Sequence, residues 1–115
     1  MATFTKQALT GDADGEGILV TAEVGDTHTT IHTTTSETTF DEIWLYATNN
    51  HSSAVSLTIE YGNTTSTLVI EQSIPSKSGL TVIIPGLILA ADKIVKAYAG
   101  SANKIVIFGY VNRIT

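Results

Sequence analysis

Acidic residues near the N-terminus have the spacing of a calcium-binding loop. The loop positions 1, 3, 5 and 12, which supply oxygen ligands in EF-hands, are held by Asp12, Asp14, Glu16 and Glu23. Gly17 stands at position 6, where such loops turn sharply. Two features count against calcium: glutamate is longer than the Asp or Asn usual at position 5, and the flanking residues favour strands over helices. A solvated acidic turn is therefore preferred, and no metal or other cofactor is predicted.

The histidines also have a spacing that can bind metal. His28 and His32 form an H-x3-H pattern, which chelates an ion when it lies on a helix. The surrounding threonines and isoleucine favour a strand, where residues four apart share a face about 13 Å from each other at about 3.3 Å per residue. Two exposed strand histidines are therefore predicted. His51 follows Asn49-Asn50 and is expected to cap a hairpin turn.

The remaining polar residues do not make a recognisable catalytic set. Glu60 and Glu71 could form the carboxylate pair of a glycosidase, but both fall on outward positions where solvation explains them. The sequence has no Gly-x-Ser-x-Gly elbow and no glycine-rich phosphate loop before a helix. It has no cysteine, which excludes a thiolate zinc site. No catalytic residue is predicted, and the chain is not expected to be an enzyme.

Short apolar runs separated by turn signals dominate the chain after residue 40. They span residues 43–47, 55–61, 68–70, 80–84, 94–98 and 105–111. Strands of this length at nearly regular spacing are typical of an all-β sandwich or barrel. We predict a single antiparallel β-sandwich of about eight strands, jelly-roll-like or Ig-like, without a convincing helix.

A chain of 115 residues is expected to form one domain. Residues 1–17 are interpreted as a flexible N-terminal arm with an acidic loop, although residues 3–9 could instead form an edge strand. Residues 18–115 are assigned to the sandwich. Within them, the threonine-rich stretch 28–34 is predicted to be a half-buried or edge strand with Ile31 inward.

Two runs carry apolar side chains on the face that alternation points outward. Trp44 and Tyr46 alternate with Ile43 and Leu45, and the last run is apolar on both faces. The predicted interface residues are Trp44, Tyr46, Val106, Phe108 and Tyr110. Three alternatives stay open: the last strand bends from one sheet to the other, the Trp44 and Tyr46 rings pack in the core, or they form a sugar-stacking platform.

The composition favours association. Hydrophobic residues make up 43% of the chain and charged residues only 15%, against about 25% charged in average domains. The net charge of −5 is uneven, because residues 1–42 hold eight acidic side chains and one lysine while residues 43–115 hold three acidic and five basic ones. This asymmetry could steer subunits together, or it could be chance.

No basic cluster is interleaved with aromatics, and no apolar stretch approaches the roughly 20 residues of a membrane span. Neither nucleic acid nor a membrane is therefore an expected partner.

Six segments resemble small virion structural proteins of tailed bacteriophages. The segments are 41–47, 57–62, 74–75, 79–87, 95–99 and 109–114, within residues 40–115. The resemblance implies a small β-sandwich on the phage particle, either a capsid decoration (cement) protein or a neck or tail component. It carries over no functional residue, because no motif of the family marks one.

The combined expectation is a non-enzymatic virion component, made in the host cytoplasm, that self-associates on the shell. Its predicted partners are its own copies, in a homo-oligomer such as a trimer, and the major capsid protein or other virion proteins. The alternative is a neck- or tail-associated or host-contacting carbohydrate-binding module. That module would use Trp44, Tyr46 and Tyr61, with calcium at residues 12–23.

Overall fold

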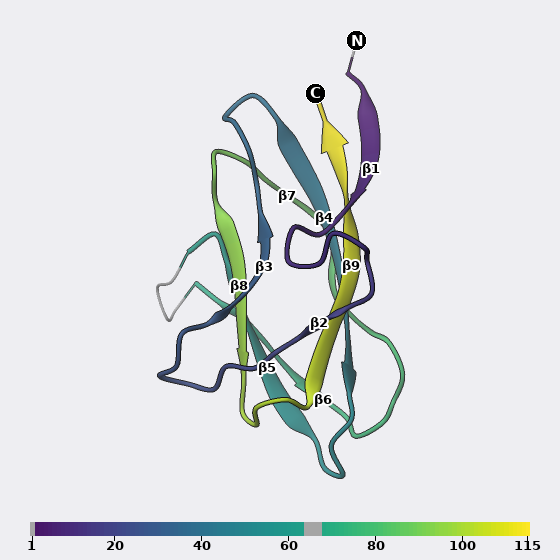
Figure 1. The fold of residues 1–115 in the computed structure, drawn as a ribbon, viewed down its shortest axis with the longest axis vertical. Coiled ribbons are helices and arrows are strands. Elements are labelled where there is room, and N and C mark those ends of the chain that lie inside the picture. Colours follow the sequence, from purple (N-terminus) through teal and green to yellow (C-terminus); the bar gives the residue numbers. More distant parts are fainter. Residues whose placement is uncertain (1, 64–67) are drawn as a thin grey trace.

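A computed structural model of the chain describes residues 2–63 and 68–115, which form two stacked antiparallel sheets (Figure 1). The strands of this part are β1 (Phe4–Ala8), β2 (Ile18–Leu19), β3 (Thr29–Thr33), β4 (Phe40–Asn49), β5 (Val55–Tyr61), β6 (Ile70–Ile74), β7 (Thr81–Leu89), β8 (Ile94–Ala99) and β9 (Ile105–Ile114). The all-β sandwich predicted from the apolar runs is confirmed. The described residues hold nine strands, where about eight were expected.

The two sheets differ in size. Sheet A has five strands in the order β1-β9-β4-β7, with β2 also pairing β9, and sheet B has four in the order β3-β8-β5-β6. The longest ladder joins β4 to β9 over ten positions, from Phe40↔Ile114 to Asn49↔Ile105. These two strands form the middle of sheet A (Figure 1).

The N-terminal segment forms an edge strand of sheet A, which is the alternative to an arm that the sequence left open for residues 3–9. β1 pairs with the C-terminal half of β9, and Thr3 and Thr115 exchange both backbone hydrogen bonds at 2.9 Å. Leu9 is buried in the core immediately after the strand. The following loop is attached to sheet B, because the Gly11 amide donates to the Ile31 carbonyl. Residues 3–11 are therefore bonded to strands of both sheets.

The core lies between the two sheets and follows the period-two alternation of the strands. In β4, Ile43, Leu45 and Ala47 are fully buried, whereas the residues between them are half-buried and face outward. Leu57 and Ile59 of β5 close the core from sheet B. The register of β4 therefore determines both which side chains enter the core and which lie on the outside of sheet A, because successive side chains point to opposite faces.

Gly109 sets the spacing between β4 and β9. It lies opposite Leu45, and a Cβ added to it would lie 2.0 Å from the backbone oxygen of Trp44. No side-chain rotation can relieve such a contact, because the obstacle is backbone. The position therefore requires glycine for close approach of the two strands.

We expect Gly109→Ala to destabilise the fold by about 1–3 kcal/mol or more, because the added methyl must push β4 and β9 apart. Gly100→Ala is the matched control, since its Cβ would meet the Ser56 hydroxyl at 2.9 Å, and that side chain can turn away. Urea unfolding of the three proteins measures the difference. Equal midpoints for Gly109→Ala and Gly100→Ala would contradict the argument.

Candidate functional site

The five predicted interface residues lie together on the outer face of sheet A, the side turned away from the core. Trp44 stands opposite Tyr110, and Tyr46 stands opposite Phe108. Val106 lies at the next outward position of β9, opposite Thr48. Because β9 stays paired with β4 along its whole length, the alternative of a strand bending between the sheets is wrong. We call these five side chains, with the outward residues around them, the outer face.

Trp44 is held in one orientation on this face. Its ring is stacked on Tyr110 with centroids 6.2 Å apart and an interplanar angle of 11°. Its indole Nε1–H donates to Glu42 at 2.8 Å. On the β7 side it lies against Gly86, where an added Cβ would be 2.9 Å from the indole. Trp44 has therefore already lost most of the side-chain entropy that binding would otherwise cost.

A row of polar side chains crosses the outer face beside these rings. Asn112 on β9 donates to the Glu42 carboxylate at 2.9 Å, and Lys6 on β1 places its ammonium 4.7 Å from the Tyr110 ring centroid. Hydrogen bonds from Asn112 and then Trp44 lower the pKa of Glu42 below its usual value, so the carboxylate is charged at neutral pH. The sequence interpretation missed this row, because nothing local places residues 6, 42 and 112 at one level.

Apolar side chains also line the margins of the outer face. Phe4 of β1 is 67% exposed and Ile88 of β7 is 57% exposed. Leu19 of β2 lies next to Val106, and Val82 of β7 lies next to Tyr46. The apolar surface therefore continues across sheet A from β1 and β2 to β7.

The edges of the two sheets are less suited to contact than the outer face. β7 has Pro85 and two register shifts against β4, and β1 carries Lys6 at its centre. Residues of the β1–β2 loop bond to the outer edge of β3, through Gly11 and the Ile31 carbonyl. The short edge strand β6 carries the exposed Glu71. Prolines, bulges, charges and loop cover are the devices that prevent edge-to-edge strand pairing.

The acidic loop does not form a calcium-binding cage. Asp12 accepts a hydrogen bond from the Asp14 amide at 3.0 Å, which is an Asx turn, and the Glu23 carboxylate accepts from the Ala102 amide at 3.0 Å. Across residues 2–63 and 68–115, no group of three or more His, Cys, Asp or Glu side chains is placed to hold a metal ion. Asp12, Asp14, Glu16 and Glu23 are therefore not brought together as a ligand set.

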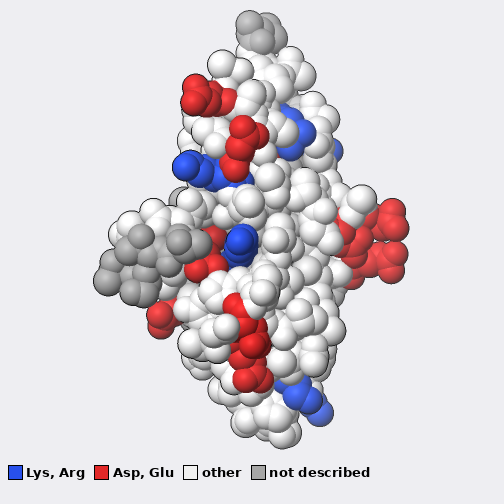
Figure 2. Space-filling view, turned by 60° about the vertical axis from the view of Figure 1, so that its left-hand side comes forward, with Lys and Arg blue, Asp and Glu red and all other residues white. Residues whose placement is uncertain are grey.

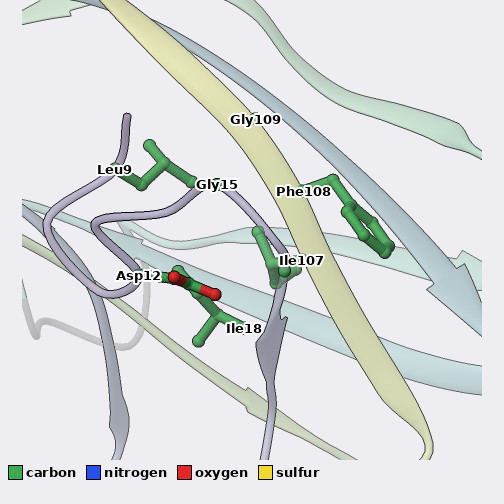
Figure 3. A pocket seen from close by; sticks show the side chains of 8 residues that line it. Leu9, Asp12, Gly15, Ile18, Ile107, Phe108 and Gly109 are labelled. Carbon is green, nitrogen blue, oxygen red and sulfur yellow. The ribbon is translucent and has the colours of Figure 1, made fainter. Parts of the chain in front are cut away.

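A small cavity lies beside this loop, against the middle of β9 (Figure 3). Leu9, Asp12 and Ile18 line one part of it, and Ile107 and Phe108 line another. Its volume of about 10 Å³ is close to the least that one water molecule needs. It is too small for a substrate.

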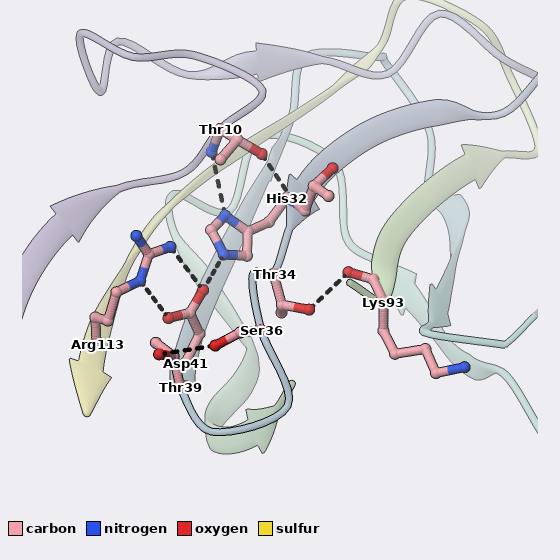
Figure 4. Close-up of polar contacts among 9 residues, drawn as sticks. Thr10, His32, Thr34, Ser36, Thr39, Asp41, Lys93 and Arg113 are labelled. Atoms are coloured by element: carbon pink, nitrogen blue, oxygen red, sulfur yellow. Dashed lines mark hydrogen bonds and ion pairs between the residues drawn. The ribbon is translucent and has the colours of Figure 1, made fainter. Parts of the chain in front are cut away.

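His32 is fully buried, so the prediction of an exposed strand histidine is wrong for this residue. A register shift in β3 between Thr30 and His32 breaks the alternation, and both Ile31 and His32 are buried. The Thr10 amide donates to His32 Nδ1 at 3.2 Å, and Nε2 lies 2.7 Å from Asp41 (Figure 4). Because Nδ1 accepts a hydrogen bond, the ring is neutral and its proton is on Nε2.

Asp41 is the centre of this buried network. Arg113 binds it through two hydrogen bonds, Nε to Oδ1 at 2.8 Å and Nη2 to Oδ2 at 3.1 Å (Figure 4). Burial alone would raise the pKa of Asp41, but the hydrogen bonds from Arg113 and His32, together with the charge of Arg113, outweigh it, and the pKa is lowered. The Asp41 side chain is fully buried, so it stabilises the fold and cannot reach a substrate.

Glu60 is also less exposed than predicted. It is only 4% exposed and bonds His28, whose ring lies 4.4 Å from that of Tyr98. The neighbouring strand places Lys96, not Glu71, opposite Glu60. The carboxylate pair of a glycosidase is therefore not formed, because Glu60 is bonded to a histidine.

An open groove of about 430 Å³ lies near Glu60 at the start of β8. It is lined by Glu60, Gly62, Asn63, Asp92, Lys93, Ile94 and Lys96. Figure 2 brings this side forward and shows acidic and basic side chains interspersed on it rather than gathered by sign. The groove therefore has no dominant charge that would select one class of ligand.

Two further sequence interpretations change in the structure. Asn49, rather than His51, organises the β4–β5 turn. Its Oδ1 accepts a hydrogen bond from the His51 amide at 2.8 Å, and its Nδ2 donates to the Ser53 and Ile74 carbonyls.

The Tyr61 hydroxyl is buried without a hydrogen-bond partner among the described residues. Burial, and then the charge of Asp41, raise the pKa of Tyr61. Tyr61 therefore does not join Trp44 and Tyr46 on a common surface.

No protein-family model matches this chain, and no curated protein and no solved structure is significantly similar to it. Within its described residues, no helix is long and apolar enough to cross a membrane.

We expect Asp41→Asn to lower the free energy of unfolding by about 3–5 kcal/mol, because it breaks a buried charge network. The lowered pKa of Asp41 contributes stability that is complete above about pH 5 and lost as the pH falls through the folded-state pKa. The wild type should therefore lose more stability than Asp41→Asn between pH 5 and pH 2. Urea unfolding across this range measures both effects.

Asp14→Asn is the control, because this exposed side chain belongs to no buried network. It should leave the stability and its pH dependence near those of the wild type. Parallel pH profiles for the wild type and Asp41→Asn would show that the network does not carry the acid response.

Proposed function

We propose that this chain is a non-enzymatic structural protein that self-associates through the outer face of sheet A. By its resemblance to tailed-bacteriophage virion proteins, we place it on the phage particle as a capsid decoration (cement) protein. In this role its partners are its own copies and the major capsid protein.

The aromatic surface assembled by β4 and β9 carries this proposal. The five strands of sheet A hold 36 residues, and at about 3.3 Å along a strand and about 4.8 Å between strands they present roughly 600 Å². A typical stable interface buries roughly 800 Å² per partner. Tyr, Trp and Phe are the side chains most enriched in such interfaces. The outer face therefore has nearly the size and the composition of a protein–protein contact.

The arrangement of the polar residues supports a non-enzymatic role. Asp41 and His32 are fully buried and bonded to each other, and their remaining bonds are made by Arg113 and the Thr10 amide. Glu60 is bonded to His28. These ionisable side chains are thus bonded within the fold, whereas the side chains of the proposed contact surface are mainly aromatic.

A carbohydrate-binding module is the second candidate, because two aromatic rings, Trp44 and Tyr110, lie nearly parallel beside each other on the outer face. A glycan array, run with and without calcium, tests it. A bound glycan whose signal is lost in Trp44→Ala would favour this candidate. Absence of binding under both conditions would remove it.

The location on the particle is tested by the genes that flank this one. A major capsid gene as neighbour supports decoration of the shell. Tail genes as neighbours would move the proposal to the neck or tail, and a neighbourhood without virion genes would contradict both.

We expect Phe108→Ser to raise the dissociation constant of self-association at least about 10-fold, because central aromatic residues dominate interface energies. Phe108 is half-buried and points away from the core, so the domain should stay folded. Sedimentation velocity over a concentration series measures association, and circular dichroism reports the fold. Val24→Ser is the control, since Val24 is 77% exposed in the β2–β3 loop, outside the outer face.

A wild type that stays monomeric at all concentrations would refute the proposed self-association. A Phe108→Ser protein that associates like the wild type would show that copies meet through another surface.

A further inference from the structure

We infer that two copies of this chain pack their outer faces together around a two-fold axis that runs along β9. The inference rests on the proposed self-association and specifies its geometry. The predicted occupant of the outer face is thus a second copy of the same chain, placed by the charges and side-chain sizes on both sides of β9.

Opposite charges flank β9 at one level of the outer face. In the ladders, Asn112 is opposite Lys6 on one side and opposite Glu42 on the other. Two strand spacings separate the lysine from the glutamate, which is about 10 Å. In the described part of the chain, neither residue forms an ion pair within the protomer.

A two-fold axis along β9 joins these charges between copies. Rotation by 180° about this axis lays β1 of each copy over β4 of the other, at the same level along the strands. Lys6 then faces Glu42 of the partner subunit, and Glu42 faces the partner's Lys6. An isologous contact of this kind forms every pair twice, so one complementary pair becomes two.

The next outward row fits the same axis by size. Ala8, Tyr110 and Trp44 stand side by side on β1, β9 and β4. The rotation places the large Trp44 against the partner's Ala8 and the small Ala8 against the partner's Trp44, while Tyr110, on the axis, faces the partner's Tyr110. Large side chains opposite small ones are what close packing of two faces requires.

Other two-fold axes in the plane of the outer face do not give this match. An axis across the strands would lay β1 on β1 and bring like surfaces together. An axis along β4 would lay β9 over β7, so that Lys6 and Glu42 would not meet. The axis along β9 is therefore favoured by the charges, and it predicts a dimer as the building unit instead of the trimer suggested by the sequence.

Charge exchange tests this geometry. We expect Lys6→Glu and Glu42→Lys each to raise the dissociation constant at least about 10-fold at low ionic strength, because each places like charges opposite each other twice. The double variant, Lys6→Glu with Glu42→Lys, restores both pairs and should return to within about threefold of the wild type. Glu37→Lys is the control, since it reverses an exposed charge in the β3–β4 loop.

A cross-linking measurement gives an independent readout if Glu42→Lys disturbs Trp44. Asn112 lies on the proposed axis, so Asn112→Cys should face its own copy and be joined rapidly by a short bismaleimide. The chain has no other cysteine, so the bismaleimide can react only at the introduced thiol. Ser73→Cys, exposed on β6 of sheet B, is the control and should cross-link slowly.

The outcomes separate this inference from the proposed function. Restored association in the double variant, together with Asn112→Cys cross-linking, supports the axis along β9. The axis is overturned if neither charge reversal weakens association, or if the double variant does not restore the association that the single variants lose. In either case, Phe108→Ser still tests the outer face. A wild type that never associates overturns both.

Discussion

The pairing of β4 with β9 is the constraint on which both surfaces of sheet A depend. Ten residue pairs fix the register, and Gly109 lets the two backbones approach where any side chain would meet the Trp44 carbonyl. A slip by one residue would turn Ile43 and Leu45 outward and Trp44 inward, because alternate residues face opposite sides. The burial of the core therefore also determines which aromatic side chains reach the surface.

The Asp41 network joins sheet B to this central pair. His32 comes from β3, Asp41 from β4 and Arg113 from β9, so one carboxylate connects three strands of two sheets. Loss of one partner from this network would destabilise the fold, since an unpaired buried charge costs several kcal/mol of folding free energy. Here each partner is satisfied, including His32 Nδ1 by the Thr10 amide. The network thus also holds the segment that follows β1 in place.

The alternating pattern of single strands was readable from the sequence, whereas contacts between distant strands were not. In the run containing Trp44 and the run containing Phe108, period two alone shows which side chains share a face, and the aromatic side chains of each run share one. The position of His32 did not follow, because a bulge in β3 breaks the period at that point. Bulges depend on the neighbouring strand and have no strong local signature.

Register between strands far apart in the chain explains the other differences. Lys6, Glu42 and Asn112 form one row only because β1 and β4 both pair with β9 at the same level. The same holds for the network of residues 32, 41 and 113. For the acidic loop, the spacing of residues 12–23 suggested a calcium site that the structure does not form. Glu23 instead accepts a hydrogen bond from the amide of Ala102, which lies far along the chain and outside the spacing pattern.

The combination of closed edges and an open face limits how copies of this fold can meet. Strand addition needs a free, regular edge, and proline, bulges, a lysine and a covering loop interrupt the edges described above. A flat apolar face has no such protection, but alone it would not specify an orientation. In the proposed dimer, the row from Lys6 to Glu42 would supply that orientation, because its two ends differ in sign across β9. In the proposed dimer, the aromatic area would contribute affinity, and the charged row would select the arrangement in which that area is buried.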